Sequence, residues 1–214
     1  MPTATTHEPA DQRARLREAL LDLSLGRGYP DFDLEALLER AGVDGESFHR
    51  HFTDLDDCFC AILAETYDEF FAYAQLSVAG VEGWRDRIRA TAYAMLRFLL
   101  RDERVAHLGA VDAGRGGKRA QVLFVETFER LVDLIDEGRG ETTEPDSFTR
   151  ATAVGVGGVI FARVQEAVAG GELELGEEEL PKLMYAAVFP YLGAAAADEE
   201  LHAPPPPDPA APKG

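Results

Sequence analysis

Apolar residues recur with a helical period along almost the whole chain, and this pattern constrains the fold more than any other feature of the sequence. In residues 11–27, for example, Leu16, Leu20 and Leu23 are spaced at i, i+4 and i+7. No segment shows the sustained alternation of apolar and polar residues that a half-buried strand requires. The sequence therefore predicts an all-α protein.

Capping residues and glycines divide this periodic pattern into separate helices. The predicted helices span about 11–27, 34–40, 84–100, 104–111, 118–137, 147–169 and 178–197, with two more between Asp44 and Gly80 that meet at Asp54. We expect residues 11–60 to form a first helical unit and residues 61–201 a second. Residues 202–214 hold six of the twelve prolines and no large apolar side chain, so they predict a disordered or polyproline-like tail.

The chain is strongly acidic, with 21 basic against 39 acidic residues and a net charge of −18. Such a charge repels nucleic-acid phosphates, so DNA binding would need a local basic surface. The first unit carries six arginines against twelve acidic residues. Residues 84–119 are strongly basic, with nine basic and four acidic residues, and form either a solvated helix face or the border of a DNA or anion-binding surface.

The sequence predicts a cytoplasmic protein without a membrane segment. Residues 1–10 show no basic and apolar pattern of a secretory signal. The uncharged apolar stretch 151–162 is shorter than the roughly 20 residues that a membrane span needs. Cys58 and Cys60 are two residues apart on a predicted helix, which disfavours a mutual disulfide and suits a reducing compartment.

The break Ala41-Gly42-Val43-Asp44 separates two short predicted helices. Glycine permits a positive φ in such a turn, and the apolar Val43 can fill the space between the helices. This spacing predicts a helix-turn-helix, whose second helix enters the major groove of DNA. Two helices packed in an ordinary core would give the same pattern.

Residues 13–60 resemble, without a gap, the N-terminal domain of the TetR (tetracycline repressor) family of bacterial transcriptional regulators. The matching residues are Arg13, Leu16, Ala19, Gly28, Tyr29, Leu34, Leu37, Ala41, Gly42, Val43, Phe48 and Phe52. The remaining chain is similar only in its succession of helices, in Gly157-Gly158 and in residues 189–193. The resemblance implies a helix-turn-helix domain that binds double-stranded DNA, followed by a ligand-binding and dimerisation domain.

The resemblance places Gly45, Glu46 and Ser47, which open the third helix, at the positions that contact bases. A glutamate can accept a hydrogen bond from the N4 amine of cytosine. In that position Glu46 can equally be a carboxylate that the helix dipole stabilises.

Phosphate contacts are expected from Arg13, Arg15, Arg50 and His49. His49 occupies the position of a phosphate-binding tyrosine of the family, and Leu55 that of a lysine. Because these two departures weaken the expected backbone contacts, a second interpretation stays open. In it, the chain is a TetR-fold protein with lost or altered DNA binding that acts through ligand or protein contacts.

Aromatic residues at helical spacing in the second unit form either plain core or the wall of a cavity for a small hydrophobic ligand. The candidate ligand-binding residues are Phe70, Tyr73, Tyr93, Phe98, Phe124 and Phe128, with His107 and Gln165 as polar groups. Glycines at 155, 157 and 158 and the apolar stretch 184–192 predict a homodimer interface between helices. A dimer would bind a palindromic operator, and a ligand would release this repressor by moving the fourth helix.

No metal, cofactor or catalytic site is expected. His49 and His51, like Cys58 and Cys60, are two residues apart, and such side chains diverge on a helix and cannot readily share one ion. No serine or cysteine nucleophile motif is present. The sequence therefore predicts a protein that is not an enzyme.

Overall fold

The computed structural model describes residues 9–171 and 176–209, and within these ranges the chain forms helices and no strand. The predicted all-α class is confirmed. The helices are α1 (Pro9–Arg27), α2 (Leu34–Ala41), α3 (Gly45–His49), α4 (Leu55–Val78), α5 (Trp84–Arg101), α6 (Glu103–Ala110), α7 (Lys118–Asp136), α8 (Arg150–Gly170) and α9 (Gly176–Glu200). Three short 3-10 turns, Asp112–Gly114, Glu137–Glu141 and Pro145–Ser147, lie between α6 and α8.

The turn between α2 and α3 forms as the sequence predicts. The carboxylate of Asp33 caps α2 by accepting from the backbone N–H of Ala36 at 2.9 Å, and Asp44 caps α3 by accepting from Ser47 N–H at 2.8 Å. Gly42 ends α2 with φ of 60°. This left-handed conformation is the reason why the position needs glycine.

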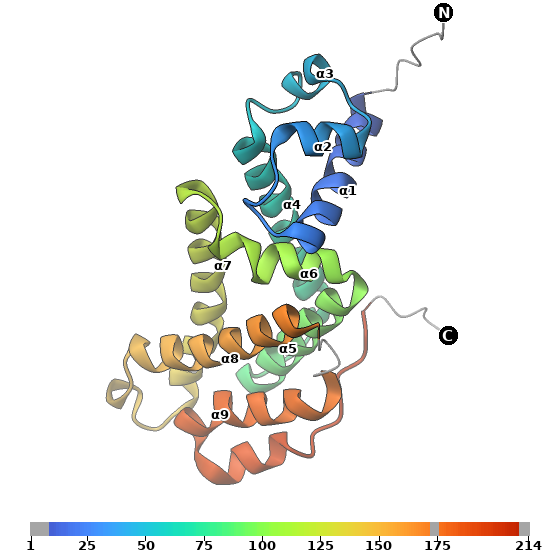
Figure 1. Cartoon of the computed structure of the whole chain (residues 1–214). Helices are drawn as coiled ribbons and strands as arrows, with labels where there is room; N and C mark the ends of the chain where they lie inside the picture. Colours follow the sequence, from blue (N-terminus) through green and yellow to red (C-terminus); the bar gives the residue numbers. More distant parts are fainter. Residues whose placement is uncertain (1–8, 172–175, 210–214) are drawn as a thin grey trace, which may run out of the picture.

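The N-terminal unit, which consists of α1 to α3 and the first turns of α4, lies at one end of the molecule (Figure 1). Helices α8 and α9 lie at the opposite end, and α4 runs from the N-terminal unit into the rest of the chain (Figure 1). A single buried core continues from Leu16 and Phe48 through Phe59 to Phe98 of α5. The buried core is therefore continuous across residue 60, and α4 packs with both the N-terminal and the C-terminal unit.

The last helix is longer than the predicted 178–197 and is bent. Gly193 has φ of 76°, which interrupts the helical backbone. After this bend the chain reaches Glu200, which is 2% exposed and accepts hydrogen bonds from Arg85 and Arg89 of α5. Burial of its carboxylate opposes ionisation, but the bonds from Arg89 and Arg85 lower the pKa of Glu200 below its ordinary value.

The expected disordered tail takes a different form in the part that the structure describes. Residues 203–208 form a segment that belongs to no helix or turn, and the carbonyl groups of Pro206 and Pro207 accept hydrogen bonds from Arg97. Because proline has no backbone N–H, a run of prolines cannot form the backbone hydrogen bonds of a helix. The carbonyl groups of the run therefore remain available to accept from side chains. Residues 210–214 of the predicted tail lie outside the described residues.

Helix α8 is long and apolar enough to cross a membrane by length and composition, although its uncharged stretch 151–162 is shorter than a membrane span. Only 22% of the most apolar 18-residue stretch of this helix is buried. Val154 and Val159 are 40% and 57% exposed, whereas Ala153 and Gly157 face inward. An apolar face of α8 therefore remains uncovered in the single chain.

Candidate DNA-binding surface and ligand cavity

Helix α3 turns a polar face outward from the end of the molecule. The side chain of Glu46 is 90% exposed and that of Arg50 is 52% exposed, and they form an ion pair at 3.3 Å. His49 is also exposed, whereas Phe48 is fully buried. Three of the seven predicted DNA-binding residues are thus free to meet another molecule.

Ser47 does not occupy the predicted base-contacting position. It is 3% exposed, and its hydroxyl donates to Asp44 Oδ2 at 2.9 Å and accepts from Arg50 Nη2 at 2.5 Å. The cap at Asp44 turns this side chain inward. Gly45, beside it, is half-buried, and a Cβ there would lie 4.0 Å from Leu38.

Arg13 and Arg15, which were predicted to contact phosphates, bond to other groups of the protein. Arg15 donates from Nε to the carbonyl of Ala41 at 2.9 Å and also bonds to the carbonyl of Gly42. Arg13 pairs with Glu65 and lies 5.0 Å over the ring of Phe52. Both arginines are half-buried, and their bonds connect α1 to neighbouring elements.

Acidic side chains surround the first turn of α4, next to α3. Asp54 caps α4 by accepting from the N–H of Asp57 at 2.8 Å, and Asp56 follows it. Arg119, near the start of α7, donates to Asp57 at 3.1 Å. Hydrogen bonds from the N–H of Thr53 and from Arg119 lower the pKa of Asp57.

Arg119 brings α7 into the electrostatics of this surface. Its side chain is 62% exposed, and the preceding Lys118 is exposed as well. Both cations come from the predicted basic section 84–119. The sequence indicated this section but not that α7 starts beside α4.

Cys58 and Cys60, whose spacing disfavours a shared metal ion, are buried in α4. Burial raises the pKa of the Cys58 thiol to about 12, which disfavours the thiolate that metals bind. Cys60 is 3% exposed.

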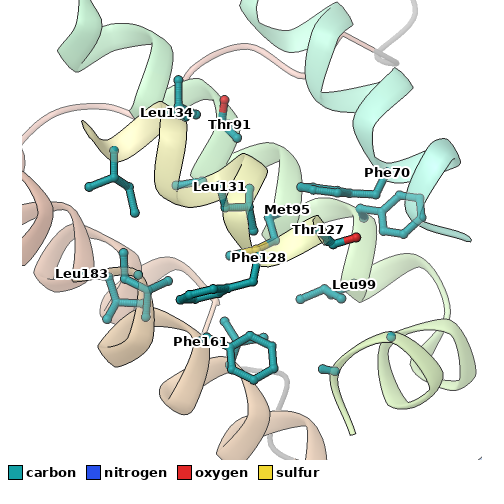
Figure 2. A pocket seen from close by; sticks show the side chains of 18 of the residues that line it. Phe70, Thr91, Met95, Leu99, Thr127, Phe128, Leu131, Leu134, Phe161 and Leu183 are labelled. Carbon is teal, nitrogen blue, oxygen red and sulfur yellow. The ribbon is translucent and has the colours of Figure 1, made fainter. Parts of the chain in front are cut away.

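A cavity of about 140 Å³ lies at the centre of the C-terminal unit, between six helices (Figure 2). The lining contains no charged side chain, and its polar members are three threonines and Tyr67. The apolar lining includes Phe70 of α4, Met95 and Phe98 of α5, Phe124 and Phe128 of α7, Phe161 of α8 and Leu183 of α9. Such a lining suits an apolar molecule.

A second cavity of about 50 Å³ adjoins the first, between α5, α8 and α9. The two share six lining residues, among them Met95 and Leu183. The second cavity adds Arg163 and Glu179, the charged groups of the combined lining.

Four predicted ligand-binding residues, Phe70, Phe98, Phe124 and Phe128, line the main cavity. The other four lie elsewhere. Tyr73 donates to Asp208 at 2.7 Å and Tyr93 lies beneath Arg97.

The polar candidates also face away from the cavity. His107 Nδ1 lies 3.5 Å from Asp112 Oδ2, and Gln165 donates to the carbonyl of Ala110 at 3.0 Å. The sequence missed Phe161 and Leu183, because α8 and α9 are apolar on several sides and periodicity does not identify their cavity face.

Helix α6 connects the cavity with α1. Its Gly109 and Ala110 line the cavity. At its N-terminal end, Arg104 bonds to Asp22 of α1 at 2.8 Å. Just beyond its C-terminal end, Asp112 accepts from Ser24 of α1 at 2.6 Å. A displacement of α6 by a ligand would therefore pull on α1 at two points.

Solved structures share this architecture. The fatty acid degradation regulator FadR from Bacillus halodurans superposes with a TM-score of 0.69 at 12% identity, covering 86% of this chain and 97% of that one. A TetR-like transcriptional regulator from Rhodococcus sp. RHA1 gives the same score and coverage at 17% identity. FadR from Bacillus subtilis, solved with stearoyl-CoA, gives 0.63 at 12% identity, covering 85% of this chain and 98% of that one.

No protein-family profile and no curated protein sequence matches the chain. The structural similarities show a helical fold with an N-terminal helix-turn-helix and a C-terminal helical unit. This is the fold of the TetR-family transcriptional regulators.

Proposed function

We propose that this protein is a TetR-type transcriptional regulator, not an enzyme, that binds double-stranded DNA in the cytoplasm through α3. The observation that carries the proposal is the outward face of α3 at one end of a chain whose other unit encloses an apolar cavity. The first feature suits a DNA groove, and the second suits a small hydrophobic ligand.

Glu46 and His49 of α3, with Arg50 directly after it, are the residues that we assign to DNA contact. Glu46 accepts from cytosine, and Arg50 leaves its exposed ion pair with Glu46 to bind phosphate. Lys118 and Arg119 supply additional positive charge beside the acidic first turn of α4. Their positive charge partly replaces that of the lysine that the family has at position 55, where this chain has Leu55.

We propose that the protein forms a homodimer through α8, and the uncovered apolar face of this helix supports the proposal. Outward positions on this helix recur at i, i+3, i+4, i+7, i+8 and i+11, as one face of a helix requires. They are Ala151, Val154, Gly155, Gly158, Val159 and Ala162. A Cβ at Gly155 or Gly158 would meet no atom within 4 Å, so a partner helix can approach closely. A homodimer would bind a palindromic operator through two copies of α3.

The ligand that we propose is a molecule with a long apolar chain. The main cavity takes this chain, and a polar end lies toward Arg163 in the second cavity. The FadR neighbour from Bacillus subtilis, solved with stearoyl-CoA, supports this class. We infer that filling the cavity displaces α6, and with it α1, so that the repressor leaves its operator.

Selection of bound sequences from random DNA at low salt tests the DNA-binding step. The full-length protein should enrich a palindrome, and Arg50→Ala should lose that enrichment. Arg163→Ala, at the far cavity, is the matched control and should keep it. Stearate, stearoyl-CoA and stearyl alcohol, added separately to the enriched DNA complex, then identify the polar end that the ligand needs.

A second candidate function is that of a TetR-fold ligand sensor that does not bind an operator. The carboxylates of Asp54, Asp56 and Asp57 at the start of α4 favour it, because they repel phosphate at the position where a lysine is usual. Ligand binding without any enriched DNA sequence would support this candidate against the first.

A further inference from the structure

The chain after α9 lies in extended form against α4 and α5, on a surface that the proposed function does not use (Figure 1). Arg97 of α5 donates from Nη2 to the carbonyl of Pro206 at 2.5 Å and from Nη1 to that of Pro207 at 3.3 Å. Tyr73 of α4 donates its hydroxyl to Asp208 Oδ1 at 2.7 Å. This one segment therefore bonds to two helices.

The receiving surface, which we call the tyrosine–arginine surface, consists of Tyr73, Tyr93, Arg97 and Arg101. The guanidinium of Arg101 lies 4.0 Å over the ring of Tyr73, and that of Arg97 lies 5.6 Å over the ring of Tyr93. Aromatic rings and side-chain donors are the groups that recognise extended proline-rich segments, whose carbonyls lack partners of their own. The surface has both.

The exposure of the segment repeats every three residues. Ala203, Pro206 and Pro209 are half-buried, whereas Pro204, Pro205 and Pro207 are exposed. A polyproline II helix has three residues per turn and turns one residue in three toward a docking surface. Asp208 is half-buried in addition, because it accepts from Tyr73.

We propose that the tyrosine–arginine surface is a docking site for proline-rich extended segments, and that residues 203–209 of the same chain occupy it as a strap across α4 and α5. Leu201 and His202 are the residues between α9 and the strap. Such a short tether gives an effective concentration in the millimolar range, so that a contact too weak for a free peptide is held within the chain.

The strap has a mechanical consequence. Because it bonds to Tyr73 of α4 and to Arg97 of α5, a seated strap holds the C-terminal half of α4 against α5. Burial and the hydrogen bond to Asp208 also raise the pKa of Tyr73.

A labelled peptide of residues 202–209 tests the docking site. Fluorescence anisotropy should show binding to a variant that ends at His202, and binding to the full-length chain should be at least about 10-fold weaker because the strap already fills the site. Within the shortened chain, Arg97→Ala should abolish peptide binding. Arg87→Ala is the matched control on the same helix, since Arg87 pairs with Glu137 away from the strap, and it should bind as the parent does.

A second measurement needs no truncation. In the full-length protein, Arg97→Ala and Tyr73→Phe should both speed amide hydrogen exchange in residues 70–78 and leave α3 unchanged, whereas Arg87→Ala should not. Equal peptide binding by the full-length and shortened chains, or unchanged exchange in both strap variants, would overturn the proposal.

Discussion

The hydroxyl of Ser24 in α1 donates a hydrogen bond of 2.6 Å to Asp112 Oδ2, and neither residue has any exposed surface. These residues are 88 positions apart in the sequence. A buried carboxyl group requires polar neighbours, because burial without them is costly. His107 lies 3.5 Å from the same oxygen, so the three residues form a polar contact between α1 and the end of α6.

Replacing Ser24 with alanine removes the donor and leaves Asp112 with less compensation. We expect Ser24→Ala to lower the free energy of unfolding by about 1–3 kcal/mol, the usual range for a buried group that loses its partner. Urea denaturation measures the change. Ser77→Ala is the control, because the hydroxyl of this half-buried serine bonds to the carbonyl of Tyr73 within its own helix.

The same substitution also tests the proposed route from the cavity to the N-terminal unit. If α6 signals through Ser24, the variant should still bind the selected DNA but respond less to the ligand. A ligand response equal to that of the parent protein would exclude Ser24 from this route.

A larger side chain in the wall of the cavity should block ligand binding without unfolding the protein. Ala187 is fully buried in α9 and lines the cavity, so Ala187→Leu should fill part of the space. The parent should gain about 2.7 kcal/mol of stability from a ligand at 100 times its Kd, and the variant should lose most of this gain. Thermal melting with and without stearoyl-CoA measures it.

Ala195→Leu, on an exposed part of α9, is the control for that experiment and should respond as the parent does. An unchanged ligand-induced shift in Ala187→Leu would place the ligand outside the cavity.

Acid should weaken the contact between α1 and α6. Hydrogen bonds from Arg40 and Arg104 lower the pKa of Asp22, and the bond from Arg104 lowers that of Asp102. Because both values are lower in the folded protein than in the unfolded chain, the stabilisation is complete above the ordinary value of 3.8 and is lost as the pH falls through the lower folded values.

Urea denaturation between pH 5 and pH 2 checks this dependence. Arg104→Gln should flatten part of the slope, whereas Arg87→Gln, which removes an exposed ion pair with Glu137, should change it less. A slope that is the same in all three proteins would contradict the assignment.

The sequence predicts the helices and the turn at Gly42 because both depend on local rules. Caps such as Asp33 and Asp44 act within three residues, and helical period is visible in any window. The role of Arg13 could not be predicted in this way. Whether a side chain faces DNA or bonds inward depends on groups such as Glu65, 52 positions away, that only the folded chain brings near.

The cavity shows the same limit. Aromatic spacing identified Phe70 and Phe128, but it also selected Tyr73 and Tyr93, which do not line the cavity. Tyr73 donates to Asp208, and Tyr93 lies beneath the guanidinium of Arg97. Helical periodicity identifies the buried residues of a helix, but it does not distinguish those that line the cavity from those that pack elsewhere.

Gly42 offers the sharpest test of the turn itself. Its φ is 60°, and a Cβ there would lie 3.0 Å from Arg15 Nη2, the group that bonds to the carbonyls of this turn. Gly42→Ala should therefore lower the free energy of unfolding by about 1–2 kcal/mol, the usual cost of a left-handed conformation for a residue with a Cβ.

Gly26, in the last turn of α1, is the matched position. A Cβ there meets no atom within 4 Å and its backbone is helical, so Gly26→Ala should stabilise the protein by about 0.4–1 kcal/mol. Urea denaturation of both variants should give changes of opposite sign. Equal effects at the two positions would mean that the strained turn between α2 and α3 does not form in solution, and the DNA-binding face of α3 would lose its support.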